Sequence, residues 1–92
     1  MKTINRENLE KIDFHLDEKM TEMFKSNIDP HYEYYVSHNK RYILQSCYNN
    51  LTLEDGFGWN LHIDNSDMSS IASCDVEYIE QILALIEIYK DY

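Results

Sequence analysis

The 92-residue chain lacks long apolar runs, and this absence limits where the protein can reside. No run approaches the roughly 20 apolar residues that a membrane-spanning helix needs. The amino-terminal stretch MKTINRENLEK contains no apolar segment of the kind that marks a secretory signal. We therefore expect a cytoplasmic protein. A chain of this length is expected to form a single compact domain over residues 1–92.

Cysteine is scarce, because Cys47 and Cys74 are the only two in the chain. Small secreted domains with little core depend on several disulfides, so the one bridge that two cysteines allow argues against that class. In a cytoplasmic protein both thiols are expected to be reduced. A hydrophobic fraction of 43% is sufficient for one modest core without cross-links.

Positive charge is the next shortage: eight lysines and arginines face 17 aspartates and glutamates, giving a net charge of −9. Such a field repels nucleic-acid phosphates and anionic lipid head groups, which argues against direct binding to either. The segment from Asn49 to Tyr89 contains eight acids and no lysine or arginine at all. Two interpretations follow: the acids keep the protein soluble, or they face a partner with a basic surface.

Motifs for catalysis or metal binding are also missing. The four histidines and two cysteines are scattered and show none of the short paired spacings of a zinc site. His62 and Asp64 form a same-face pair on a predicted strand, and a solvent-facing contact explains this pair without a metal. We therefore expect no metal, no cofactor and no catalytic residue, and the protein is predicted not to be an enzyme.

Both glycines lie in the stretch LEDGFGWN, which also holds the only tryptophan. A phosphate-binding glycine loop usually opens a helix and has a cation nearby, whereas here two acids precede Gly56 and a strand pattern follows. Asp55-Gly56 is instead a favoured hairpin dipeptide, because both residues tolerate positive φ. The stretch therefore predicts a turn, with Gly58 at a bulge or a close backbone approach.

Two segments have the periodicity of amphipathic helices. Apolar residues recur at intervals of three and four over about 5–26, where Thr3 or Asn5 can serve as the N-cap. The same spacing recurs over about 74–89, where Ser73 can serve as the N-cap.

The segments between the predicted helices alternate as strands do. Residues 32–48 predict a hairpin with a turn in the middle, and residues 57–64 predict a third strand. Residues 69–73 predict either a loop or a short edge strand. The predicted class is α+β in the order α-β-β-β-α: an antiparallel sheet of three strands, or four with the edge strand, flanked by an amino-terminal and a carboxyl-terminal helix.

Tyrosine is abundant, with eight residues, and tyrosine is favoured at protein interfaces. Alternation places Tyr34 and Val36 on one face, expected to be half-buried, and Tyr35 on the opposite face. For Tyr35 and Phe14, the pattern fits an interface role and burial equally well. The predicted partner-binding residues combine exposed acids with nearby aromatics: Glu54, Asp55, Phe57, Asp64, Asp67 and Tyr35.

In size, charge and absence of catalytic motifs, the chain resembles the small acidic inhibitors of phages and mobile elements, including anti-CRISPR proteins that mimic DNA. The resemblance implies a non-enzymatic inhibitor that binds a basic, nucleic-acid-binding surface of a larger protein. One alternative is an immunity protein that neutralises a toxin, which gene neighbourhood would distinguish. Another is a structural homodimer whose open sheet face pairs with itself, which a sizing column would reveal.

Overall fold

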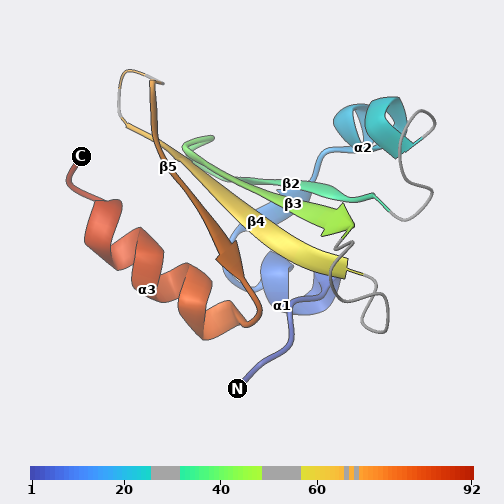
Figure 1. Cartoon of the computed structure of the whole chain (residues 1–92), viewed down its shortest axis with the longest axis horizontal. Coiled ribbons are helices and arrows are strands. Elements are labelled where there is room, and N and C mark those ends of the chain that lie inside the picture. Colours follow the sequence, from blue (N-terminus) through green and yellow to red (C-terminus); the bar gives the residue numbers. More distant parts are fainter. Residues whose placement is uncertain (26–31, 49–56, 66, 68) are drawn as a thin grey trace.

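A computed structural model describes residues 1–25, 32–48, 57–65, 67 and 69–92 (Figure 1). They form an α+β fold in which a five-stranded antiparallel sheet is combined with short amino-terminal helices and a carboxyl-terminal helix. In chain order the elements are α1 (Arg6–Glu10), β1 (Phe14–Leu16), α2 (Glu18–Lys25), β2 (Tyr34–Ser37), β3 (Tyr42–Tyr48), β4 (Phe57–Asp64), β5 (Ser70–Val76) and α3 (Ile79–Tyr89).

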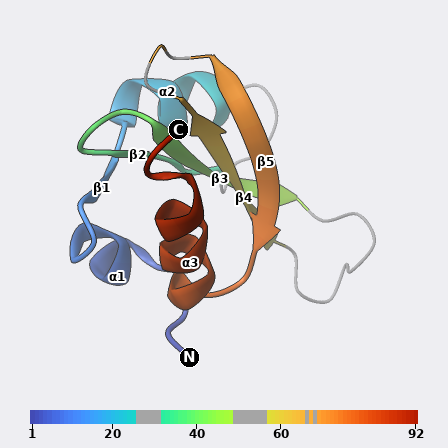
Figure 2. The ribbon, with the colours of Figure 1, turned by 90° about the vertical axis from the view of Figure 1, so that its left-hand side faces the viewer.

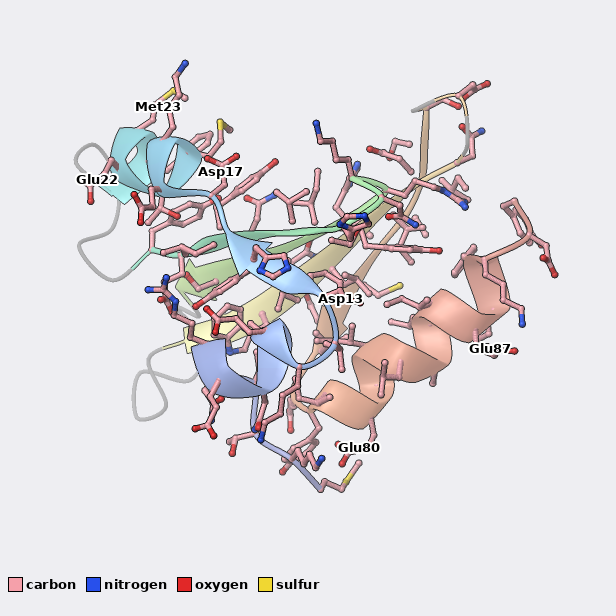
Figure 3. The ribbon with its side chains drawn as sticks, turned by 180° about the vertical axis from the view of Figure 1, so that it is seen from behind. Asp13, Asp17, Glu22, Met23, Glu80 and Glu87 are labelled. Atoms are coloured by element: carbon pink, nitrogen blue, oxygen red, sulfur yellow. The ribbon has the colours of Figure 1, made fainter. Side chains whose placement is uncertain are left out.

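The sheet is a meander, so strands that follow one another in sequence are neighbours in space, in the order β1-β2-β3-β4-β5. The register places Tyr35 opposite Leu44, Leu44 opposite Leu61 and Leu61 opposite Cys74. One row of side chains therefore crosses four strands on the same face. Helices α1 and α3 lie on this face, whereas α2 lies on the other side, at one end of the sheet (Figures 1 and 2).

The hydrophobic core lies between the sheet and the two helices that cover it. Leu44, Leu61 and Ile63 of the sheet are fully buried, as are Leu9 of α1 and Ile82 of α3. Full burial of an aliphatic side chain contributes about 1.5–3 kcal/mol relative to exposure, so this cluster holds α1 and α3 on the sheet. No described helix has the length and apolar character needed to cross a membrane.

The prediction of one helix over 5–26 is wrong, because the chain changes direction twice within it. Asp13 adopts a positive φ of 64°, which ends α1 and turns the chain into β1. Phe14, which lies off the helical stripe, is buried at 1% exposure in β1 opposite Ser37. Asp17 then starts α2 by accepting a hydrogen bond from the Met20 N–H at 3.0 Å.

The first helix nevertheless begins where its cap was predicted. The Asn5 side chain accepts a hydrogen bond from the Asn8 N–H at 2.8 Å, which satisfies one of the free donors of the first turn. The prediction of Asn5 as an N-cap is therefore confirmed.

The hairpin predicted over 32–48 and the strand predicted over 57–64 are confirmed as β2, β3 and β4. The predicted edge strand at 69–73 is present and longer than expected, since β5 continues to Val76. As a result α3 begins at Ile79 rather than near Cys74, and Ser73 is part of β5 rather than an N-cap. The sheet has five strands instead of three or four because β1 and β5 extend it on opposite sides.

Arg41 links the end of α3 to the sheet. Its Nε donates to the carbonyl oxygen of Asp64 at 3.0 Å, and its Nη2 donates to those of Tyr92 at 2.7 Å and Tyr89 at 3.3 Å. Its Nη1 donates to the Lys90 carbonyl at 3.3 Å. The last carbonyls of a helix have no partner within the helix, so this guanidinium satisfies groups that would otherwise depend on water.

Tyr35 is a core residue, which corrects its predicted role at an interface. It is 0% exposed, its ring centroid lies 6.1 Å from that of Trp59, and its hydroxyl donates to Glu33 Oε2 at 3.1 Å. Tyr34 and Val36 occupy the opposite, less covered face and are half-buried, as predicted. The tyrosine alternation contains no information about which face the helices cover.

The buried phenol predicts a loss of stability at alkaline pH. Burial, and next the negative charge of Glu33, raise the pKa of Tyr35 above its ordinary value of about 10. A raised pKa in the folded state means that the contribution to stability is complete below pH 10 and is lost as pH rises toward the folded pKa. Urea unfolding at several pH values should show a falling free energy of unfolding above about pH 10, and the Tyr35 phenol should be among those that ionise late in absorbance at about 295 nm.

Two variants separate this cause from general alkaline damage. Tyr35→Phe should remove one of the phenols whose pKa is raised, another being Tyr34, and should reduce the alkaline decline, whereas Tyr92→Phe, at a position 61% exposed, should leave the decline unchanged. An identical alkaline profile for wild type and Tyr35→Phe would contradict the assignment.

Candidate partner-binding surface

The shortage of cations in the second half of the sequence becomes an asymmetry in space. Seven of the eight lysines and arginines precede β4, and only Lys90 follows it. Because the sheet is a meander, β4 and β5 lie together at one side of it, and α3 packs against them through the core (Figure 2). Glu80 and Glu87 of α3 nevertheless have positive neighbours, because the Lys2 N–H donates to Glu80 Oε1 at 2.9 Å and Lys90 Nζ lies 2.7 Å from Glu87 Oε1.

On the amino-terminal side, two of the cations are paired with acids of α1. Arg6 Nε lies 3.1 Å from Glu10 Oε1, and Lys11 Nζ lies 3.6 Å from Glu7 Oε1, both at i,i+4 spacing. Exposed pairs of this kind contribute little to stability, because solvent screens the two charges. They neutralise this face locally, as expected of an ordinary solvated helix surface.

The exposed acids beside β5 have different surroundings. We define the acidic flank of β5 as Asp67, just before the strand, Asp75, within it, and Glu77, just after it. All three are exposed. Asp75 Oδ1 accepts a hydrogen bond from Asn60 Nδ2 at 3.3 Å, and in the described part of the chain no lysine or arginine forms an ion pair with any of the three. This flank therefore presents uncompensated negative charge.

The residues predicted to bind a partner do not form one surface. Glu54 and Asp55, with the turn predicted at Asp55-Gly56, lie outside the described residues. Phe57 opens β4, where its backbone pairs with Tyr48, and Asp67 follows the other end of that strand. Of the six predicted residues, Asp67 is the one that the described structure places on an exposed acidic surface.

Asp64 is buried, which corrects its predicted exposure. It is 7% exposed, and its Oδ1 lies 2.8 Å from Nε2 of His62. The predicted same-face pairing of His62 with Asp64 is therefore confirmed. Because the carboxylate already has this partner and little contact with solvent, Asp64 is not part of the acidic surface.

Asp75 and Glu77 were not among the predicted contact residues. The sequence pattern assigned both to the first turn of a helix starting near Cys74, where acids stabilise the helix dipole. The alternation of polar with apolar residues over 73–76 was the available signal that this segment is instead a strand.

A shallow groove of about 690 Å³ lies on the less covered face of the sheet, between the start of α2 and the turn after β2. Its floor is apolar, with Val36 and Ile43, and its rim carries Asp17, Glu18 and Lys40. Burial, and next the charge of Asp17, raise the pKa of Tyr34, which also lines the groove. Charges of both signs surround this groove, so its lining selects neither a cationic nor an anionic ligand.

The described residues contain no cluster of three or more histidine, cysteine, aspartate or glutamate side chains able to hold a metal ion. Cys74 on β5 is a free, partly exposed thiol.

Comparison of the chain with protein-family models, with curated proteins and with solved structures finds no match.

The loop before β5 predicts an acidic residue that keeps its charge at low pH. The Ser69 hydroxyl, then the Ser69 N–H at 2.9 Å, and then Asn65 hold the pKa of Asp67 below its ordinary value. Since the folded-state pKa is depressed, the stabilising contribution is present above the unfolded-state pKa and is lost as pH falls through the folded-state pKa. An NMR titration of the side-chain carboxyl should show this lowered pKa.

The matched variant is Ser69→Ala, which removes the hydroxyl but keeps the backbone donor. It should move the pKa of Asp67 toward the ordinary value of about 3.9 without altering other carboxyl groups. An unchanged pKa in Ser69→Ala would show that the hydroxyl is not the cause.

Proposed function

We propose that this protein is a non-enzymatic inhibitor that binds a basic, nucleic-acid-binding surface of a larger protein and blocks it. The observation that carries the proposal is the acidic flank of β5, whose exposed carboxylates form no ion pair with a described lysine or arginine. The net charge of −9 adds a long-range attraction to any basic surface. The carboxylates compete with phosphates for the same lysines and arginines, because both are anionic acceptors of their hydrogen bonds.

Electrostatic complementarity gives such a binder its selectivity and its rate of association. Oppositely charged surfaces can raise association rate constants from about 10⁵–10⁶ to 10⁸–10⁹ M⁻¹s⁻¹ at low salt, and like charges suppress wrong partners. A nucleic-acid enzyme has a basic groove already adapted to anions, so a folded acidic domain can occupy that groove without being a substrate.

Affinity capture tests the proposal. The immobilised protein is incubated with bacterial lysate treated with nuclease, and bound proteins are eluted with a salt gradient. We expect a nucleic-acid-binding protein that elutes as ionic strength rises and whose purified activity on DNA or RNA decreases when the chain is added. Binding that resists high salt, or a partner whose nucleic-acid-dependent activity is unchanged, would overturn the proposal. Recovery of a toxin without a nucleic-acid site would instead identify an immunity protein.

A further inference from the structure

The two edges of the sheet differ in how they are protected. β1 is only three residues long, and α1 and α2 adjoin its two ends in sequence. β5 is seven residues long, contains no lysine or proline, and pairs only with β4 among the described strands. Figure 2 shows no described helix beside its outer edge. Natural sheets usually shorten, charge or cover such edges, because an uncovered edge is a template for another strand.

The hydrogen-bond pattern identifies which backbone groups of β5 face outward. The Asp64 N–H donates to the Arg41 carbonyl at 2.8 Å, so the even-numbered residues of β4 bond to β3. Its odd-numbered residues therefore bond to β5, and the register makes their partners the even-numbered residues of β5. The register shifts between Ile63 and Asp64, so this alternation holds from Ala72 to Val76, where Ser73 and Asp75 direct their N–H and C=O groups away from the sheet.

We propose that a basic extended segment of the partner protein adds to β5 as a sixth strand. The backbone groups of Ser73 and Asp75 supply the hydrogen bonds, and the acidic flank of β5 selects lysine and arginine on the incoming segment. This inference rests on the proposed function and specifies how the basic partner is recognised. Main-chain pairing gives affinity that is independent of sequence, while the charges give the preference for a basic segment.

Electrostatic repulsion disfavours a second copy of the chain as the molecule that adds a strand to β5. Antiparallel pairing of two β5 strands would set the start of each strand against the end of the other. Asp67 of one copy would then lie near Glu77 of the other, which places like charges together. Each copy also carries a net charge of −9.

Hydrogen exchange with a defined probe tests the inference directly. The probe is a peptide of alternating lysine and threonine, equal in length to β5, added to the full chain labelled for NMR. We expect the amides of Ser73 and Asp75 to become protected on binding, whereas those of Ala72 and Cys74 are protected before the peptide is added. Protection elsewhere, with no alternating gain along β5, would overturn the inference.

Two control peptides separate backbone pairing from charge. The same peptide with alternate amides N-methylated keeps its lysines but cannot pair along the edge, and it should bind at least about tenfold more weakly. A peptide with glutamate in place of lysine should not bind. Equal binding of the methylated and unmethylated lysine peptides would overturn strand addition and leave the proposed function intact. Equal binding of lysine and glutamate peptides would contradict the charge-based proposed function itself.

Variants at Ser73 provide a second, independent test. Ser73→Pro removes an outward N–H without removing a backbone hydrogen bond to β4, and proline is tolerated on edge strands. Ser73→Ala is the matched control, because it removes only the hydroxyl, which donates to Asn60 Oδ1 at 3.0 Å. With circular dichroism unchanged, Ser73→Pro should weaken lysine-peptide binding at least about tenfold while Ser73→Ala weakens it less than about twofold.

Equal affinity of the two Ser73 variants would overturn the edge inference. If Ser73→Pro does not fold, the exchange pattern of the wild-type chain decides alone. Concentration-dependent protection of Ser73 and Asp75 without peptide, together with a dimer in sedimentation, would show that a second copy of the chain adds to β5 and would reject the basic segment.

Discussion

Replacing Asp75 and Glu77 together by lysine is expected to weaken binding of the basic partner at least about 30-fold. Both side chains are exposed beside β5, and no described cation forms an ion pair with either. The variant Asp75→Lys/Glu77→Lys removes two attractive charges and introduces two repulsive ones in the same place. Titration of the purified partner by isothermal calorimetry, at one fixed ionic strength, measures the change in Kd.

The matched control carries the same change in net charge at a different place. Each replacement of an acid by lysine adds two positive charges, so both Asp75→Lys/Glu77→Lys and Glu7→Lys/Glu18→Lys change the net charge from −9 to −5. The control alters exposed residues of α1 and α2 and should change Kd less than about threefold. Equal losses in the two variants would show that net charge, and not the acidic flank of β5, determines binding.

Arg41→Ala is expected to lower the free energy of unfolding by about 2–3 kcal/mol. The guanidinium donates to four carbonyl oxygens, at 2.7–3.3 Å, and thereby connects the sheet to the last turn of α3 and the chain end. Its removal leaves helix-end carbonyls to water and loosens the contact of α3 with the core. Urea unfolding followed by circular dichroism measures the loss.

Two further variants show whether geometry or charge is responsible. Arg41→Lys keeps the charge but has no planar fork of donors, so it should recover less than half of the lost stability. Lys11→Ala, which removes an exposed ion pair with Glu7, should cost no more than about 0.5 kcal/mol. Full recovery by lysine, or equal effects of Arg41→Ala and Lys11→Ala, would contradict the role given to the guanidinium.

The central strands could be predicted from the sequence because local pattern and tertiary environment agree there. In β4, Leu61 and Ile63 alternate with polar residues, and both prove fully buried. The amino-terminal segment could not be predicted, because apolar residues keep the spacing of a helix over 5–26 although the helix is interrupted there by β1. The chain turns at Asp13, whose φ is 64°. Phe14 then lies in the sheet, and its burial depends on core residues that are distant in sequence.

The candidate surface could be predicted only in its general character. The absence of lysine and arginine between 49 and 89 indicated an acidic face, and the meander places β4 and β5 side by side. Choosing residues within that segment required knowledge of the strand faces. Tyr35 and Asp64 proved buried. Asp75 and Glu77 were predicted in a helix, but Asp75 lies in the edge strand β5 and Glu77 directly follows it. Burial depends on which face of the sheet the helices cover. The alternation of polar and apolar residues along a strand does not reveal that face.

Competition between the chain and duplex DNA for the purified partner tests the central claim most directly. The partner is titrated with the chain at about 0.05 and 0.5 M salt, with and without a saturating concentration of unlabelled duplex DNA. The account predicts that DNA displaces the chain and that the higher salt weakens binding at least about tenfold, because the Debye length becomes shorter than the distances across the interface. Simultaneous binding of DNA and the chain, with a Kd insensitive to salt, would contradict it.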